Sequence, residues 1–326
     1  MRAVVIWEHG GLDKLQVVDD WPMPEVRAHD VLVEVKACAL NYLDIFVRRG
    51  MPGLPIPLPH ISGGDIAGVI VEIGREVRHC HVGQRVLINP ASPEGMLGEE
   101  LQGGMAEYVR TPATHVIPLP DTISFEQAAA LPVAYGTAWR QVVERGKVAP
   151  METVLILGAS GGVGTGAVQI AKYCGAIVWA CASSAEKLRR LKALGADEVI
   201  NYREVDFSTT AWQMSGRKGV DVIIDNTGAE TWVKSLRTLR RGGRLLTCGA
   251  TTGFDPKTDI RYIWRRELTI LGCNGWTQDG LEKLLTLVAR GIITPVIDRI
   301  LPLEQAAAAE AAMERREIFG KIILKP

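Results

Sequence analysis

The segment Thr153–Gly164 constrains the fold more than any other part of this 326-residue chain. It reads TVLILGASGGVG, an apolar run followed by a glycine-rich turn, and the helical stretch Thr165–Cys174 comes directly after it. Glycines let a backbone approach a pyrophosphate closely, and a helix N-terminus presents free N–H groups to it. A strand, such a turn and a helix in this order predict a dinucleotide site, whereas a turn that serves packing alone is the alternative. The predicted contacts are Ala159, Ser160, Gly161, Gly162, Val163 and Gly164.

The alternation of apolar strands with helical segments continues after this turn. Short continuous apolar runs separated by helices are typical of a parallel sheet that is covered on both faces. The expected strands are Thr153–Leu157, Ile177–Ala182, Glu198–Ile200, Val220–Asp225, Arg244–Cys248 and Leu268–Gly272, with helices near Gly162–Cys174, Ala185–Leu194 and Ala229–Leu239. This part of the chain is therefore predicted to be a doubly wound α/β domain.

The chain before this domain has a different pattern. Strand-like runs such as Val31–Ala37, Ile66–Ile73 and Arg85–Asn89 are separated by glycine and proline, which predicts a β-rich region. Ser124–Gln127 has the sequence of a helix start, with a serine cap and a glutamine three residues later. The tail is predicted to be helical and to end in the strand Lys321–Leu324.

Composition narrows the class of function. The chain carries 37 basic and 37 acidic residues, so nothing in its charge favours binding to nucleic acid or an anionic membrane. No apolar run approaches the roughly 20 residues that a membrane-spanning helix needs. The six cysteines form no C-x-x-C pair, and buried reduced thiols in a cytoplasmic protein explain them better than disulfides or zinc. A small molecule is the expected partner.

The residues after the second strand of the α/β domain bear on the choice of cofactor. An acidic side chain at this strand end would bind the free 2′-hydroxyl of NAD(H). Here Ser183 and Ser184 follow the strand, and Lys187 lies one turn into the helix. Hydroxyls and a cation without a carboxylate suit a 2′-phosphate, so we predict NADP(H), with Glu186 expected to face solvent.

Several motifs resemble the medium-chain dehydrogenase/reductase superfamily, and the likeness spans the whole chain. They are Gly63–Gly68, Val82–Val86, Gly161–Gly164, Ala167–Lys172 and Leu194–Asp197, while Asn201–Phe207 resembles the zeta-crystallin-like quinone oxidoreductase branch. The resemblance implies a GroES-like catalytic domain from residues 1–123 and 275–326, with a Rossmann domain, residues 124–274, inserted between them. It also implies a homodimer, or a tetramer, joined through the last Rossmann strand.

The resemblance also places the three zinc-ligand positions of zinc-dependent members at Asn41, Gly64 and Val133. None of these residues is a competent zinc ligand, so we expect no metal. Without a Lewis acid the acceptor must already be activated, as a quinone or an α,β-unsaturated carbonyl is. The expected activity is therefore NADPH-dependent hydride transfer to such an acceptor, in which hydrogen-bond donors stabilise the developing oxyanion.

The family motifs suggest residues beside the reacting groups. Asn41 corresponds to a polar residue near nicotinamide and substrate, unless it only caps its loop. Asp44 holds that loop or orients Asn41, with a role at the helix end as the alternative. Tyr42 either faces the cleft or, as we favour, packs. Thr137 corresponds to a position close to the nicotinamide, with a hydroxyl bonded within its helix as the alternative.

Further cofactor contacts follow from the resemblance and from the position of strand ends. Ser183, Lys187 and Tyr202 resemble the family's 2′-phosphate contacts, with an exposed helix residue as the alternative for Lys187, and Arg316 matches by its spacing to Gly320. The carboxyl ends of parallel strands are where such sheets bind ligands. The residues that follow strand ends are Asn226, Thr227, Gly249, Ala250, Thr251 and Asn274.

Other functions remain open at this stage. Among enzymes, the alternatives are an enoyl-thioester (acyl-CoA) reductase and a zinc-free alcohol dehydrogenase. A cofactor-binding structural or RNA-binding role, known among zeta-crystallin relatives, is the alternative of another class, and the neutral charge argues against RNA. The sequence determines neither the proton donor nor whether a quinone takes one or two electrons.

Overall fold

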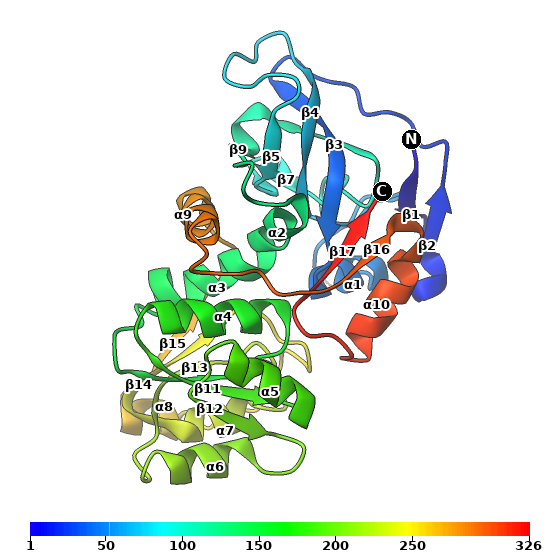
Figure 1. Ribbon diagram of the computed structural model, residues 1–326. Helices are drawn as coiled ribbons and strands as arrows, with labels where there is room; N and C mark the ends of the chain where they lie inside the picture. Colours follow the sequence, from blue (N-terminus) through cyan, green and yellow to red (C-terminus); the bar gives the residue numbers. More distant parts are fainter. Residues whose placement is uncertain (52) are drawn as a thin grey trace. The chain divides into compact units, whose positions relative to one another are not determined.

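A computed structural model describes residues 1–51 and 53–326, and these residues form two compact units (Figure 1). Unit 1 is Met1–Val133 with Leu281–Pro326, and unit 2 is Ala134–Gly280. The chain thus leaves unit 1 after Val133 and returns after Gly280, whereas the sequence placed these boundaries at 123/124 and 274/275. The first difference has a physical cause, because helix α2 (Phe125–Ala129) packs on strands β3 (Asp30–Ala39) and β4 (Asp65–Ile73) of unit 1.

Unit 2 is built on a six-stranded sheet in the order β12-β11-β10-β13-β14-β15, with every neighbouring pair parallel. This is the strand order of a Rossmann fold, so the predicted fold class is confirmed. The strands are β10 (Thr153–Ile156), β11 (Ile177–Ala182), β12 (Glu198–Asn201), β13 (Val220–Ile224), β14 (Leu239–Thr247) and β15 (Thr269–Gly272).

Helices cover both faces of this sheet, with α4 and α5 on one side and α6, α7 and α8 on the other (Figure 1). Successive strand residues point to opposite faces, so Leu155 and Ile223 pack with Phe207 and Leu236 of the second helical layer. Burial of both faces explains why the strands are continuous apolar runs. The helices are α4 (Gly162–Tyr173), α5 (Ala185–Ala193), α6 (Phe207–Met214), α7 (Trp232–Thr238) and α8 (Arg261–Arg266).

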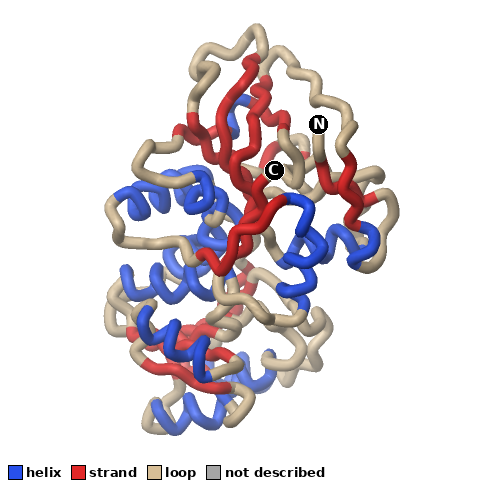
Figure 2. The backbone as a smooth tube through the Cα atoms, turned by 45° about the vertical axis from the view of Figure 1, so that its right-hand side comes forward, coloured by secondary structure: helices blue, strands red, loops and turns tan. Residues whose placement is uncertain are grey.

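Unit 1 contains a sheet in the order β16-β17-β3-β4-β5-β9, with β8 paired to β3, and the C-terminal strand β17 lies between β16 and β3 (Figure 1). Figure 2 shows the C-terminus beside red strands. Strand β17 is antiparallel to β3, with Leu324 opposite Cys38. Residues from both ends of the sequence therefore share one core. The remaining strands are β1 (Ala3–Ile6), β2 (Leu15–Val18), β5 (Arg85–Ile88), β6 (Ala91–Ser92), β7 (Gly95–Met96), β8 (Tyr108–Pro112), β9 (Val116–Pro118), β16 (Ile297–Pro302) and β17 (Lys321–Lys325).

Helices α1 (Tyr42–Arg49) and α10 (Ala306–Glu314) belong to unit 1, and α9 (Gln278–Ala289) begins in unit 2 and ends in unit 1. Helix α2 starts as predicted: the Ser124 Oγ accepts a hydrogen bond from the Gln127 backbone N–H at 3.1 Å, and the Gln127 side chain accepts one from the Ser124 N–H. Within the described residues, no helix has the length and apolar character that crossing a membrane requires.

The segment after α2 is helical but irregular. Two π-helical stretches, Leu131–Gly136 and Arg140–Arg145, flank the short helix α3 (Thr137–Trp139). Pro132 lies in the first of them and has no backbone N–H to donate, which favours a departure from regular α-helical bonding. Wider π turns are frequent at functional sites, and the predicted residue Thr137 directly follows the first of these two.

Candidate functional site

The glycine turn of unit 2 has the geometry of an anion cradle. Gly158 has φ +59°, and a Cβ on Gly164 would lie 2.4 Å from the Gly158 carbonyl oxygen and 2.6 Å from the Ala159 Cα. Only glycine therefore allows α4 to approach the end of β10 this closely. Gly161 is the N-cap of α4 and provides no side-chain cap, so the first N–H groups of the helix lack intrahelical acceptors. These features fit the pyrophosphate of a dinucleotide.

The predicted 2′-phosphate contacts of unit 2 gather at the end of β11. The backbone N–H of Tyr202 donates to the Ala182 carbonyl at 3.2 Å, which brings Tyr202 beside Ser183. Ser184 is the N-cap of α5, where its Oγ accepts from the Lys187 N–H at 3.3 Å. Glu186 is exposed, as predicted. The structure thus places the backbones of Ser183, Lys187 and Tyr202 next to one strand end, while Glu186 is exposed.

The end of β13 carries a polar network that organises two neighbouring loops. The Asn226 Oδ1 accepts from the Gln141 side chain at 2.8 Å and from the Cys248 N–H at 2.9 Å. Asp225 is fully buried and accepts from the hydroxyls of Thr231 and Ser235 and from the Thr227 N–H. The amide oxygen of Asn226 is therefore already hydrogen-bonded within unit 2, where it holds neighbouring segments together.

A hollow of about 660 Å³ opens at the ends of β14 and β15 within unit 2. Two of the predicted contacts, Gly249 and Asn274, lie on its wall, as do Arg140 and Arg145. Burial raises the pKa of the Cys248 thiol to about 12, so it stays protonated at neutral pH. The neighbouring predicted residues Ala250 and Thr251 follow in the same loop after β14.

Asn41 of unit 1 stands in a buried polar network with two charged side chains. Its Nδ2 donates to the Asp65 Oδ2 at 2.9 Å, and its Oδ1 accepts from the Lys321 Nζ at 2.5 Å. Lys321 also donates to the Asp65 Oδ2 at 3.0 Å. The exposed fractions are 9% for Asn41, 0% for Asp65 and 2% for Lys321, so the network is almost entirely shielded from water.

Asp44 holds the loop that carries Asn41 and also caps the start of helix α1. It therefore has both the loop role and the helix-end role that the sequence left open. Its Oδ2 accepts from the Asn41 backbone N–H at 2.7 Å, as a third helical residue does in a capping box, and its Oδ1 accepts from the Gly63 N–H at 3.0 Å. Burial raises the pKa of Asp44 to about 7, against the lowering effect of the Asn41 N–H.

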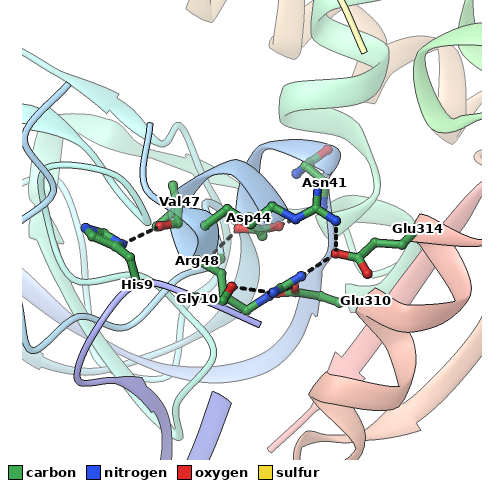
Figure 3. A network of polar contacts seen from close by, with 10 residues as sticks. His9, Gly10, Asn41, Asp44, Val47, Arg48, Glu310 and Glu314 are labelled. Atoms are coloured by element: carbon green, nitrogen blue, oxygen red, sulfur yellow. Dashed lines mark hydrogen bonds and ion pairs between the residues drawn. The ribbon is translucent and has the colours of Figure 1, made fainter. Parts of the chain in front are cut away.

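An ion network lies one turn further along α1 (Figure 3). Arg48 donates from Nε to Glu310 at 2.7 Å and also bonds to Glu314, while its Nη1 donates to the Gly10 carbonyl at 2.8 Å. Arg48 is 1% exposed and Glu310 is fully buried. Burial raises the pKa of Glu310, with Arg48 acting in the opposite direction. The network ties α1, and with it the Asn41 loop, to α10.

The other candidate residues are placed as follows. Tyr42 packs against the core of unit 1, and its ring lies edge-on to Phe46 at 5.2 Å between centroids, which agrees with the favoured interpretation. Thr137 is buried in α3 of unit 2. Arg316 is exposed in unit 1, after α10, at φ +58°.

The sequence did not single out several polar residues that build these sites, among them Asp65, Lys321, Asp225 and Gln141. Each is at most 2% exposed. A usable signal existed for Lys321, a cation at the start of the apolar run Ile322–Leu324, and for Asp65, which precedes the apolar run of β4. A charged residue within a predicted buried strand requires a partner, although the sequence does not say which.

Two family descriptions match the chain. An alcohol dehydrogenase GroES-like domain matches residues 27–121, and a zinc-binding dehydrogenase matches residues 162–290. The quinone oxidoreductase of Rattus norvegicus is 32% identical over 331 residues, covering 99% of this chain and 97% of the relative. The chain belongs to the medium-chain dehydrogenase/reductase superfamily, in its quinone oxidoreductase branch. The predicted resemblance is therefore confirmed, and the protein is an oxidoreductase of this type.

Solved structures of the superfamily agree with the fold along its full length. An NAD-dependent alcohol dehydrogenase superposes with a TM-score of 0.95 at 39% identity, and each chain is covered completely. Escherichia coli quinone oxidoreductase, solved in complex with NADPH, superposes with a TM-score of 0.89 at 28% identity, again with complete coverage of both chains.

Zinc is the metal that the matched family description implies, and the side chains at its expected site do not suit it. Asn41 offers an amide, Val133 is apolar, and Gly64 has no side chain. A Cβ on Gly64 would lie 2.8 Å from the Leu97 carbonyl oxygen, so the backbone leaves no room for a histidine there. Asp65, the nearby carboxylate, is already bonded to the Lys321 ammonium. This donor set lacks the thiolates and imidazoles that hold zinc.

Proposed function

We propose that this protein is an NADPH-dependent reductase of quinones or α,β-unsaturated carbonyls that works without zinc. One observation carries the proposal: the Asp65 carboxylate beside Asn41 is paired with the Lys321 ammonium instead of being free for a cation. An activated acceptor needs no Lewis acid for hydride transfer, since its own conjugated carbonyl takes up the negative charge.

The choice of NADPH rests on unit 2. The bare N-terminus of α4 suits the pyrophosphate, while Ser183, Lys187 and Tyr202 suit a 2′-phosphate. Escherichia coli quinone oxidoreductase, which was solved with NADPH, supports this choice, whereas the similar NAD-dependent alcohol dehydrogenase shows that the fold also serves NAD. The exposed position of Glu186 favours NADPH, because a carboxylate turned inward would repel the phosphate.

The chain's own residues would bind and orient the reactants. When bound, the nicotinamide supplies a hydride. The N–H groups of α4 hold the pyrophosphate, and the residues at the ends of β14 and β15 line a hollow suited to the nicotinamide end. Asp44 fixes the backbone of Asn41 and Gly63, so the polar loop is rigid before the acceptor arrives.

Six free cysteines agree with a reducing, cytoplasmic location.

The edge of the sheet in unit 2 agrees with a homodimer. Strand β15 ends the sheet of unit 2, and among the described residues no further strand pairs with its outer edge. Ile260 and Trp264, near and on α8, are 66% and 64% exposed. A second copy that pairs through β15 would cover such apolar surface.

The test is an NADPH-oxidation assay with 1,4-benzoquinone, trans-2-hexenal and crotonyl-CoA, run in parallel with NADH and after treatment with a chelator. We expect turnover with the quinone or the alkenal, a KM for NADPH about tenfold or more below that for NADH, and full activity after chelation. Preference for crotonyl-CoA would favour an enoyl-thioester reductase. Oxidation of alcohols alone would favour an alcohol dehydrogenase, and cofactor binding without any turnover would favour a non-enzymatic role.

A further inference from the structure

Asp65 is the point where four separate segments of unit 1 meet. Its Oδ1 accepts from the Val133 backbone N–H at 2.8 Å, and its Oδ2 accepts from Asn41 at 2.9 Å and from Lys321 at 3.0 Å. These partners lie at the start of α1, at the start of β17 and in the π-helical stretch that leads out of unit 1. The carboxylate therefore holds together parts of the chain that are far apart in sequence.

The contacts of Asn41 allow only one orientation of its amide. Its oxygen accepts from Lys321, while its nitrogen donates to Asp65 and, at 3.4 Å, to the Ala39 carbonyl. An ammonium can only donate and a carboxylate can only accept. A half-turn of the amide would set its NH₂ against the Lys321 ammonium and its oxygen against the Asp65 carboxylate. The buried ion pair therefore determines which end of the Asn41 amide faces Asp65 and which faces Lys321.

We propose that Lys321 is a positioning residue that, together with Asp65, fixes the amide of Asn41 in one orientation for the reduction reaction. The inference rests on the proposed function, in which Asn41 stands beside the acceptor. A fixed amide presents the same group to the acceptor in every turnover and needs no rearrangement during hydride transfer. Lys321 itself is 2% exposed and acts through Asn41.

A purely structural role for the ion pair predicts different behaviour in variants. Lys321→Met leaves the Asp65 carboxylate buried without its cation, which destabilises the fold whatever the pair is for. The double variant Lys321→Met/Asp65→Asn removes that unpaired charge and keeps an acceptor for the Val133 N–H. The amide introduced at position 65 would, however, favour the reversed orientation of Asn41, because its NH₂ then meets the Asn41 oxygen.

The experiment measures the melting temperature and steady-state kinetics of both variants with NADPH and the best acceptor of the wild type. The control is Lys325→Met on the same strand, since Lys325 is a half-exposed lysine paired with Glu126 at the surface. We expect the double variant to recover most of the stability lost in Lys321→Met. Its kcat should nevertheless stay about 10- to 100-fold below the wild type, with the KM for NADPH within about twofold and with the control unchanged.

Each outcome has a distinct meaning. Recovery of kcat together with stability in the double variant would show that the pair is structural only, and wild-type kcat in Lys321→Met would also overturn the proposal. If the wild type binds NADPH but reduces neither quinone nor enone, the proposed function fails, and this inference fails with it. An active wild type with active variants rejects the inference alone.

Discussion

The two units stabilise their buried charged side chains by different kinds of partner. Every buried Lys or Arg among residues 1–51 and 53–326 lies in unit 1, where Arg48 pairs with Glu310 and Lys321 pairs with Asp65. The buried carboxylate of unit 2, Asp225, is satisfied by hydroxyls and backbone N–H groups instead. Ion pairs thus hold the polar site of unit 1 in place, whereas hydroxyls and backbone N–H groups do so in unit 2.

Under the proposed function, this difference follows from what each site would hold. A dinucleotide brings its own negative charge, so unit 2 supplies a helix N-terminus and close-packed glycines, which come from one short stretch of sequence. Under the same proposal, the loop that carries Asn41 is fixed before any acceptor binds. Its partners Asp65 and Lys321 are 24 and 280 positions away, so only the folded sheet brings them together.

The largest effect is expected at the Arg48 ion pair. Arg48→Met leaves the buried Glu310 carboxylate without its cation and should lower the free energy of unfolding by about 3–5 kcal/mol. Adding Glu310→Gln should restore much of this loss, because the unpaired charge is gone. The comparison is Arg241→Met in unit 2, which breaks an exposed pair with Glu267 and should change stability very little. Urea unfolding of the wild type and the three variants measures these differences, and equal losses at both pairs would contradict the contrast between the units.

The pH dependence of Asp44 gives the next effect. Because burial raises its pKa to about 7, folded Asp44 keeps a proton between about pH 4 and pH 7 that the unfolded chain releases. Its contribution to stability therefore falls as the pH rises through this range and is level above it. The side chain of Asp44→Asn cannot titrate. The free energy of unfolding of this variant minus that of the wild type should therefore be larger at pH 8 than at pH 5, by about 3 kcal/mol.

This comparison isolates Asp44 from the groups around it. Cys38, Asp65, Lys321 and Glu310 influence the carboxylate in both proteins, so their own titrations cancel to first order in the difference. The substitution also sets an NH₂ group against a backbone N–H, which costs stability at every pH. A difference between variant and wild type that stays constant from pH 5 to pH 8 would show that Asp44 does not titrate there.

Much of the fold was predictable because its signals are local. Strand β11 has the predicted bounds, and α4 follows the glycine turn as expected. Strand β14 was predicted from Arg244 but begins at Leu239, because its first residues, LRRGG, have no strand pattern and are held by the pairing of Leu239 with Val220. Helix α6 was missed since its sequence, FSTTAWQM, is mixed in polarity and its Asp206 cap is the main local signal.

The candidate site was predictable to a different degree in each unit. The glycine turn could be identified from seven consecutive positions, 158–164, because the binding proposed for it depends on the backbone. Asn41 was identified through the family resemblance, but the partners of its amide were not. A cation in an apolar strand shows that a buried partner exists, and the register of β17 against β3 decides which one. That information arises only when the sheet forms.

A matched pair of glycine variants separates the two roles of the turn in unit 2, and its effect on stability is the smallest expected here. Gly164→Ala places a Cβ within 2.6 Å of two backbone atoms and should cost about 1–3 kcal/mol of stability. Gly161→Ala has φ −81° and meets only the Gly158 carbonyl oxygen, at 3.6 Å, so the fold should be unaffected.

The same methyl group at Gly161 nevertheless stands where the backbone is expected to meet the pyrophosphate. Gly161→Ala should therefore weaken NADPH binding by about tenfold or more while leaving the melting temperature of the free protein unchanged. Fluorescence titration with NADPH and thermal unfolding without it measure the two quantities separately. Unchanged affinity in Gly161→Ala would mean that the turn is glycine-rich for packing alone, and the dinucleotide site would then have to lie elsewhere in unit 2.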